Sequence, residues 1–117
     1  MAHKILYVDE KTANIELVRG DSFIVDLGFS KEEEEFTPES GDKFIFTMRK
    51  NYKGLANDDI LIQKEIALDE TTELELEPSD TEKLDYGSYK YDMQYDHADG
   101  RVDTPMSGVF KITKEVT

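Results

Sequence analysis

The sequence predicts an all-β fold, a sandwich of about seven or eight short antiparallel strands with one short helical turn near residues 79–84. Two observations carry this prediction. Apolar and polar residues alternate with a period of two through most of the chain, which is typical of strands that bury one face and expose the other. Clusters of Gly, Asp, Asn and Ser separate these runs at intervals of roughly 8–12 residues, as turns do.

The first half of the chain contains four predicted strands, at Lys4–Val8, Asn14–Val18, Phe23–Phe29 and residues 42–50. Gly20-Asp21 and Ser40-Gly41-Asp42 supply the turn residues between them. The four glutamates Glu32–Glu35 lie between two strands. We expect them to form a solvated loop, because exposed like charges repel one another.

The second half begins after turn residues at Asn57–Asp59 and contains four more predicted strands, at Leu61–Leu68 and at residues 72–78, 88–96 and 107–113. Lys64 interrupts the apolar face that Ile62 and Ile66 share, which indicates an edge strand or a bulge. Asp99-Gly100 favours a tight hairpin between the last two strands. Pro105 cannot donate to a strand ladder, so it marks a bulge or a strand start.

Residues 79–84, SDTEKL, form the one predicted helical turn. Ser79 or Asp80 can cap its start, and Gly87 follows its end. Gly87 permits a backbone conformation that a Cβ would penalise, or a close approach to a neighbouring strand. Tyr89 can bury its ring while its hydroxyl binds a backbone group upstream. The alternative is that Tyr89 is an ordinary inward-facing strand residue.

The pattern Asp85-x-Gly87-x-Tyr89-x-Tyr91 resembles the corner before strand F of immunoglobulin-like domains, which is Asp-x-Gly/Ala-x-Tyr-x-Cys. The resemblance implies an immunoglobulin-like sandwich. Tyr91 stands where the disulfide cysteine of antibody domains would lie, and the chain has no Trp, so the resemblance is to the wider sandwich class. The residues of this structural corner are Leu84, Asp85, Gly87, Tyr89 and Tyr91.

The amino-acid composition limits the classes of function that the chain could have. The chain has 117 residues, the size of a single domain spanning 1–117, and it has no cysteine, which excludes disulfides and thiolate chemistry. Lys and Arg number 14 and Asp and Glu 27, a formal charge of -13. Such a surface repels phosphate backbones and anionic lipids, so neither nucleic acid nor a membrane is an expected partner. The apolar run Ile5–Val8 is too short for a signal peptide, so we expect synthesis in the cytosol.

The sequence predicts no catalytic residue, cofactor or metal site. Among 27 carboxylates no general acid can be chosen without a pocket. His97 could join Ser107 and an aspartate as a triad, but triads are defined by geometry, so an exposed loop histidine is the favoured interpretation. Calcium needs about six to eight oxygens in a dedicated spacing, which is missing here. The carboxylates that could still collect calcium are Asp96, Asp99 and Asp103, or Asp58 with Asp59.

Five segments carry a wider resemblance: VRGDSFIVDLGF, SGDKFIFTMRK, LIQKEI, LELEPSDTEKLDYGSYKYDMQY and DGRVDTPMSGVFKITKEVT. From Val18 onward the chain resembles small proteins of phages and prophages of Gram-positive bacteria that are encoded among tail and baseplate genes. It is also similar to the immunoglobulin-like N-terminal domain of phage upper baseplate proteins. The run Glu32–Glu35 departs from this pattern by its extra charge, and Lys4–Val8 is not clearly part of it. The matching positions are Gly20, Asp21, Phe23, Phe46, Ile62, Lys64, Leu76, Pro78, Asp80, Thr81, Leu84, Gly87, Tyr89, Tyr91, Asp92, Gly100, Gly108 and Phe110.

This resemblance implies a non-enzymatic structural or adaptor protein of a phage or prophage tail or baseplate, acting through protein–protein assembly. Its expected partners are other phage structural proteins or further copies of the chain, and its expected location is the virion, after assembly in the host cytoplasm. Edge strands, including that of Lys64, and acidic loops are the expected docking elements.

The alternative function is a carbohydrate-binding module that reads a cell-surface glycan, which predicts a flat aromatic strip on one sheet face. Tyr7, Tyr52 and Tyr86 are the candidate surface aromatics, unless they seal the ends of the sandwich. An enzyme is a third hypothesis and predicts a deep pocket with a perturbed carboxylate or His97.

Overall fold

The computed structural model describes residues 4–8, 11–31, 34–50 and 60–114. The expectations for Glu32, Glu33, Tyr52 and the turn Asn57–Asp59 lie outside these residues. Within these residues the chain is predominantly β and has one short helix. The elements are β1 (Lys4–Val8), β2 (Lys11–Thr12), β3 (Ile15–Val18), β4 (Phe23–Lys31), β5 (Glu34–Glu35), β6 (Lys43–Arg49), β7 (Ile60–Ala67), β8 (Glu73–Leu76), α1 (Pro78–Thr81), β9 (Gly87–Asp96) and β10 (Val102–Thr113).

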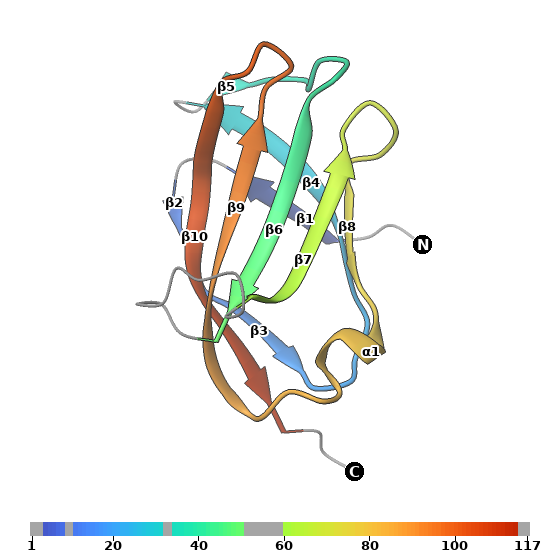
Figure 1. The fold of residues 1–117 in the computed structure, drawn as a ribbon, viewed down its shortest axis with the longest axis vertical. Coiled ribbons are helices and arrows are strands. Elements are labelled where there is room, and N and C mark those ends of the chain that lie inside the picture. The colour runs from blue at the N-terminus through green and yellow to red at the C-terminus, as the bar shows by residue number, and fades with distance from the viewer. Residues whose placement is uncertain (1–3, 9–10, 32–33, 51–59, 115–117) are drawn as a thin grey trace.

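The strands form two mixed sheets, one of which curls into a half-barrel. The smaller sheet has 4 strands in the order β1-β4-β5, with β8 also paired to β4. The larger has 6 strands in the order β2-β10-β9-β6-β7, with β3 also paired to β10. Figure 1 shows the smaller sheet behind the larger one. The eight predicted strands correspond to the eight longer strands, while β2 and β5 were not predicted.

The prediction of purely antiparallel pairing is wrong for the N-terminal strands. β1 pairs with β4 in parallel, with Lys4 opposite Val25, and β3 pairs with β10 in parallel, with Phe110 opposite Ile15. Parallel neighbours need a crossover connection. Here the chain leaves β1, contributes β2 and β3 to the other sheet, and returns as β4. Side-chain alternation is the same for both pairing directions, so the sequence pattern could not distinguish them.

The core lies between the two sheets, as the alternation of apolar and polar residues predicts. Phe29 of the smaller sheet meets two rings of the larger sheet, Phe44 at 5.5 Å and Tyr95 at 5.4 Å between ring centroids. Phe23 meets Phe110 at 6.0 Å in the same way. The buried apolar residues are Val8, Leu17, Val25, Leu27, Phe29, Phe44, Phe46, Met48, Ile62, Ile66, Leu68, Leu74, Leu76, Tyr91, Met93, Tyr95, Met106, Phe110 and Ile112.

The helical turn exists but begins and ends earlier than predicted. α1 spans Pro78–Thr81, and its N-cap is Glu77 instead of Ser79 or Asp80. Pro78 occupies the first helical position, where its fixed φ suits a helix and its missing N–H costs no hydrogen bond. Asp80 reaches back to accept a hydrogen bond from the Glu77 N–H at 2.7 Å. Within the described residues, no helix has the length and apolar character needed to cross a membrane.

The hairpin and the bulge in the C-terminal part are confirmed. The His97 N–H donates to the Arg101 carbonyl at 2.8 Å and closes the turn between β9 and β10. The register of β10 against β9 shifts between Asp103 and Met106, around Pro105. The expected loop of glutamates is wrong in part, because Glu34–Glu35 pair with the end of β4 as β5.

The strand of Lys64, β7, lies at the edge of the larger sheet, as its sequence indicates. The Lys64 Nζ lies 3.0 Å from Oδ2 of Asp80 in α1. An inward-pointing charge on an edge strand opposes pairing with the edge of another sheet. The ion pair therefore holds this charge in place and protects the edge.

Replacing Lys64 with alanine should lower the free energy of unfolding by about 0.5–1 kcal/mol, because part-exposed ion pairs contribute little. A double-mutant cycle with Asp80→Ala measures the coupling by chemical denaturation. Lys64→Val should leave stability nearly unchanged but increase aggregation, because the edge loses its inward charge. Lys43→Ala is the control, since its pair with Glu65 is more exposed. A Lys64→Val protein as soluble as the wild type would contradict the protective role.

Candidate functional site

The residues predicted to form the structural corner lie just before and within the first part of β9. The Tyr89 hydroxyl donates to the Asp85 carbonyl at 2.7 Å. Burial raises the pKa of Tyr89, and the nearby Asp85 carboxylate raises it further. Gly87 has φ +142 and a Cβ there would meet nothing within 4 Å, so the position needs the backbone freedom of glycine, not its small size. Leu84 is half-buried and packs against the core.

Tyr91 ties the N-terminal segment to the larger sheet. Its ring is buried and stacks on Phe46 at 5.8 Å, and its hydroxyl donates to the Ala13 carbonyl at 2.7 Å. Burial raises the pKa of Tyr91 to about 12. Gly108 lets Ala13 come this close, because a Cβ on Gly108 would lie 2.0 Å from the Ala13 carbonyl oxygen. Ala13 also donates its N–H to the Ser107 carbonyl at 3.0 Å. The segment between β2 and β3 is thus held by two hydrogen bonds at Ala13.

Asp42 is a buried hydrogen-bonding centre that the sequence analysis treated only as a turn residue. It is 4% exposed and accepts bonds from the Tyr95 hydroxyl at 2.5 Å and from the N–H groups of Glu39 at 2.9 Å and Ala98 at 2.8 Å. Burial raises the pKa of Asp42, but these three bonds outweigh it and hold the pKa below the ordinary value. Tyr95 is 53 residues away in sequence, so no local pattern reveals the pairing.

The structure does not bring the residues of the hypothetical triad together. His97 is largely buried, and its Nε2 lies 2.8 Å from Oδ2 of Asp103. Its ring lies over Tyr95, at 4.6 Å between centroids, so His97 is a loop histidine as expected but is only partly exposed. Ser107 is exposed on β10, opposite Asp92, and lines a different depression from His97. The arrangement of His97 is that of a structural contact at the end of the β9–β10 hairpin.

The three carboxylates considered for calcium each have a different protein partner. Asp99 pairs with Arg101 at 3.0 Å, Asp96 accepts from the Gln94 amide at 2.6 Å, and Asp103 pairs with His97. Among the described residues, no group of three or more Asp, Glu or His side chains has an arrangement that could hold a metal ion.

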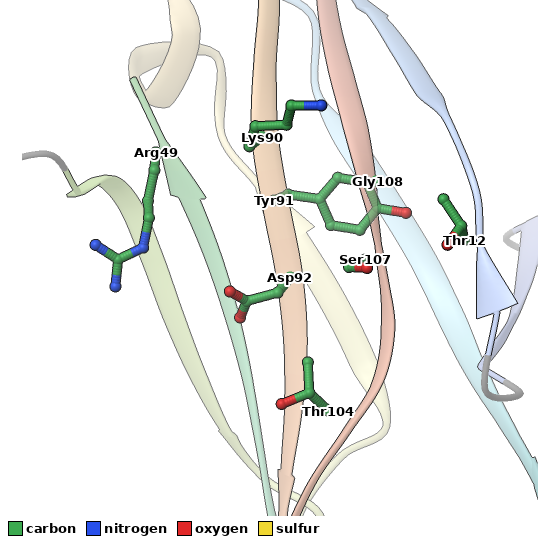
Figure 2. Close-up of a pocket in the computed structure, with 8 residues that line it drawn as sticks. All are labelled: Thr12, Arg49, Lys90, Tyr91, Asp92, Thr104, Ser107 and Gly108. Atoms are coloured by element: carbon green, nitrogen blue, oxygen red, sulfur yellow. The ribbon is translucent and has the colours of Figure 1, made fainter. Parts of the chain in front are cut away.

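One depression lies on the outer face of the larger sheet and has a volume of about 450 Å³. Figure 2 shows Arg49 on β6 and Asp92 on β9 at this depression, with Lys90 extending away from Arg49. Burial raises the pKa of Asp92, and the positive charge of Arg49 partly offsets this. In the part of the chain that the structure describes, every buried side-chain nitrogen and oxygen has a hydrogen-bond partner. The depression therefore offers a polar surface, but it contains no buried side-chain nitrogen or oxygen that lacks a hydrogen-bond partner and would bind a ligand for that reason.

A second groove lies on the outer face of the smaller sheet and has a volume of about 560 Å³. It runs from Ile5 and Tyr7 on β1, over Gly28 on β4, to Phe36 and Pro38 after β5. The Tyr7 ring lies against Gly28, where a Cβ would be 3.1 Å from the ring. We call this surface the β1 groove. The sequence analysis noted Tyr7 as a surface aromatic but could not place it beside Phe36.

Among the described residues, the exposed tyrosines do not form a strip. Tyr7 is 54% exposed on the smaller sheet, whereas Tyr86 lies in the loop before β9 with the Arg19 guanidinium 4.2 Å above its ring. Arg19 also donates to the Tyr86 hydroxyl at 2.8 Å. Two exposed tyrosines are therefore well separated in the fold, one on a sheet face and one under an arginine.

Comparison with known proteins gives one informative result. No family model matches the chain, and no curated protein matches it by sequence. Among solved structures, the fold is similar to that of the N-terminal domain of phage TP901-1 ORF48, with a TM-score of 0.57 and 11% sequence identity. The match covers 97% of this chain and 100% of that domain. The similarity to a phage protein that the spaced residues indicate is therefore confirmed at the level of the fold.

Proposed function

We propose that the chain is a non-enzymatic structural or adaptor protein of a phage or prophage tail or baseplate, which acts by assembling with other phage structural proteins. The observation that carries this proposal is the match in fold to a whole phage domain over nearly the whole chain. The spaced residues from Gly20 to Phe110 support the same assignment from the sequence alone. The chain would be incorporated into the virion after synthesis in the host.

The two side chains best suited to acid or base catalysis, Asp42 and His97, are arranged in a way that supports an assembly role. Asp42 is saturated by three hydrogen bonds, and His97 is held by Asp103 and Tyr95. Such groups stabilise a scaffold and are not poised toward a substrate. The exposed surface, in contrast, offers an apolar groove on one sheet. Repeated copies in a symmetric particle multiply weak contacts of this kind.

The proposal is tested on purified particles. After prophage induction, particles are separated by density gradient, and their proteins are quantified by mass spectrometry. We expect the chain in the particle fraction at a fixed ratio to tail proteins, and we expect particles from a deletion strain to lack a defined part of the tail tip. A chain found only in the soluble fraction of the lysate would overturn the assignment.

The carbohydrate-binding alternative depends on the exposed Tyr7 ring, since aromatic faces stack on sugars. It predicts glycan binding that Tyr7→Ala abolishes. It is the weaker proposal, because Tyr86 does not line the groove of Tyr7 and Phe36, so the exposed aromatic residues that the structure describes form no flat strip along one sheet face. A glycan array with wild type and Tyr7→Ala distinguishes the two functions.

We further propose that residues 1–117 are one immunoglobulin-like sandwich domain. Its corner consists of Leu84, Asp85, Gly87, Tyr89 and Tyr91. The hydrogen bond from Tyr89 to the Asp85 carbonyl, 2.7 Å long, supports this role. In this proposal Tyr91 takes the place of a disulfide, by joining the core to the backbone of Ala13.

Tyr89→Phe tests the corner. Removing the hydroxyl should lower the free energy of unfolding by about 1 kcal/mol, because one hydrogen bond is lost. The control is Tyr86→Phe, whose hydroxyl is exposed, with an expected change within about 0.5 kcal/mol. Urea denaturation followed by circular dichroism measures both. Equal effects of the two substitutions would count against a corner role.

A further inference from the structure

β1 is apolar on both of its faces. On the outer face, Ile5 is 49% exposed and Tyr7 is 54% exposed. Both side chains lie over Gly28, where a Cβ would be 3.1 Å from the Tyr7 ring and 3.6 Å from Cγ2 of Ile5. On the inner face, Val8 is buried and Leu6 packs against the core. The strand therefore has an uninterrupted apolar run, and its outer side chains are exposed.

β1 is also an unprotected edge. In the described part of the chain it pairs with β4 alone (Figure 1). Native proteins place charges on edge strands, which prevents pairing with another chain. β7 carries Lys64, β8 carries Glu73 and Glu75, and β5 consists of Glu34–Glu35. The run Ile5–Val8 has no such charge, so β1 is better suited than these three strands to accept an additional strand.

The charge of the chain restricts where a second copy can approach. The formal charge is -13, so two copies repel each other over most of their surface. None of the 27 Asp and Glu residues lies within β1, and Lys4 is the one charged residue of this strand. Contact between two β1 strands therefore brings no carboxylate of one strand against a carboxylate of the other.

The sequence of β1 is complementary to itself in an antiparallel pair. With Leu6 opposite Leu6 of a second copy, Ile5 lies opposite Tyr7 of that copy, and Tyr7 lies opposite its Ile5. Cross-strand pairs of a β-branched and an aromatic residue are favourable. Each Lys4 lies opposite Val8, so the two lysines are about 13 Å apart along the strands. A parallel pair in register would instead place the two lysines side by side. One strand thus supplies both halves of the interface, as a two-fold symmetric contact requires.

We propose that two copies of the chain pair through β1, antiparallel and centred on Leu6, so that their smaller sheets join into one continuous sheet. An edge of 5 residues buries less area than the roughly 1,200–2,000 Å² of a stable interface. The dimer is therefore weak, with a dissociation constant of about 10 μM to 1 mM, and it acts where a particle holds many copies close together. This inference names one contact of the proposed assembly function, and its role in a particle rests on that function.

Sedimentation equilibrium of the full chain tests the dimer. At concentrations from about 10 μM to about 1 mM we expect a monomer–dimer equilibrium. The dimer should become tighter as the salt concentration rises, because salt screens the repulsion between two negatively charged copies. A contact made by ion pairs between the copies would respond to salt in the opposite direction.

Two variants locate the contact. Ile5→Lys should weaken the dimer at least about tenfold, because it places a charge on the outer face of the edge strand. It also lowers the net negative charge, so a loss of dimer cannot come from increased repulsion. Val102→Lys is the matched control, because it makes the same charge change at an exposed apolar residue of β10 and should leave the dimer intact. The NMR spectrum of each variant establishes that it is folded.

Disulfide trapping tests the register, since the chain has no cysteine of its own. Opposite residues of an antiparallel pair have Cβ atoms about 4.5–5.5 Å apart, whereas diagonal neighbours are roughly 7 Å apart. A disulfide needs the shorter separation. An equal mixture of Ile5→Cys and Tyr7→Cys should therefore form disulfide dimers at least several-fold faster than either variant alone.

Three outcomes would overturn the inference: a chain that is monomeric at about 1 mM, a dimer that Ile5→Lys leaves intact, or a cysteine mixture that reacts no faster than its components. The particle experiment is separate. If the chain is present in particles but monomeric in solution, the assembly function stands and pairing through β1 fails. If the β1 dimer forms but the chain is absent from particles, the assembly function fails and the pairing remains a property of the isolated chain.

Discussion

Gly108→Ala should destabilise the protein by about 3 kcal/mol, which is at the upper end for an overpacked site. A Cβ at this position would lie 2.0 Å from the Ala13 carbonyl oxygen and 2.9 Å from its carbon. The atoms it meets belong to the backbone, so no side chain can rotate away. The segment between β2 and β3 must therefore move off β10, and Ala13 loses its bonds with Tyr91 and Ser107.

The measurement is the free energy of unfolding in urea, combined with hydrogen exchange of β3 and β10. We expect exchange to become faster in these two strands before the rest of the sheet is affected. Gly100→Ala is the matched control, because Gly100 also has positive φ but a Cβ there meets nothing within 4 Å. It should cost about 1 kcal/mol from backbone strain alone. An equal loss of stability at the two glycines would show that the close approach of Ala13 to Gly108 adds nothing to the effect of the substitution.

Asp42→Ala should cost about 3–5 kcal/mol, because it leaves buried partners without an acceptor. The Tyr95 hydroxyl and the N–H groups of Glu39 and Ala98 all donate to this carboxylate. Tyr95→Phe, which removes one of the three bonds, should cost about 1–2 kcal/mol. Asp99→Ala is the control in the adjacent loop and should leave the denaturation midpoint nearly unchanged. A small effect of Asp42→Ala would mean that water replaces the carboxylate.

The Asp42 carboxylate also predicts a pH dependence. Its pKa in the folded protein is lower than the ordinary value of 3.8. A lowered pKa means that the folded state favours the ionised form, so this stabilisation is present above pH 3.8 and is lost as the pH falls through the folded pKa. The stability difference between wild type and Asp42→Asn should therefore be constant near neutral pH and shrink in acid. A difference that grows in acid would contradict the assignment.

Much of the fold could be predicted from the sequence because strand alternation is local. The inward faces of β6, β7 and β9 follow directly from the period of two, and Lys64 correctly indicated an edge. The pairing of β1 with β4 and of β3 with β10 could not be predicted, because direction and partner depend on residues far apart in the chain. The start of α1 differs from the prediction because Pro78 occupies the first helical position, where its fixed φ suits a helix.

The candidate interaction surface was less accessible to sequence reasoning. Tyr7 and Phe36 come from separate segments and share a groove only because β1 inserts beside β4. Asp42 was classified as a turn residue, since Gly41-Asp42 is common turn chemistry and Tyr95 is distant. A surface site built from several strands produces no periodic pattern in the sequence, whereas the buried face of a strand produces an alternation of apolar and polar residues.

The pairing of β10 with both β9 and the N-terminal strands has a consequence for biosynthesis. β2 and β3 have β10 as their neighbour in the larger sheet, and β10 is the last strand of the described chain. The N-terminal strands leave the ribosome first but cannot take their place until β10 has been translated. Sheets that depend on such distant pairings form slowly. We therefore expect the nascent chain to remain incompletely folded during elongation, with the N-terminal segments exposed to chaperones until translation of β10 is complete.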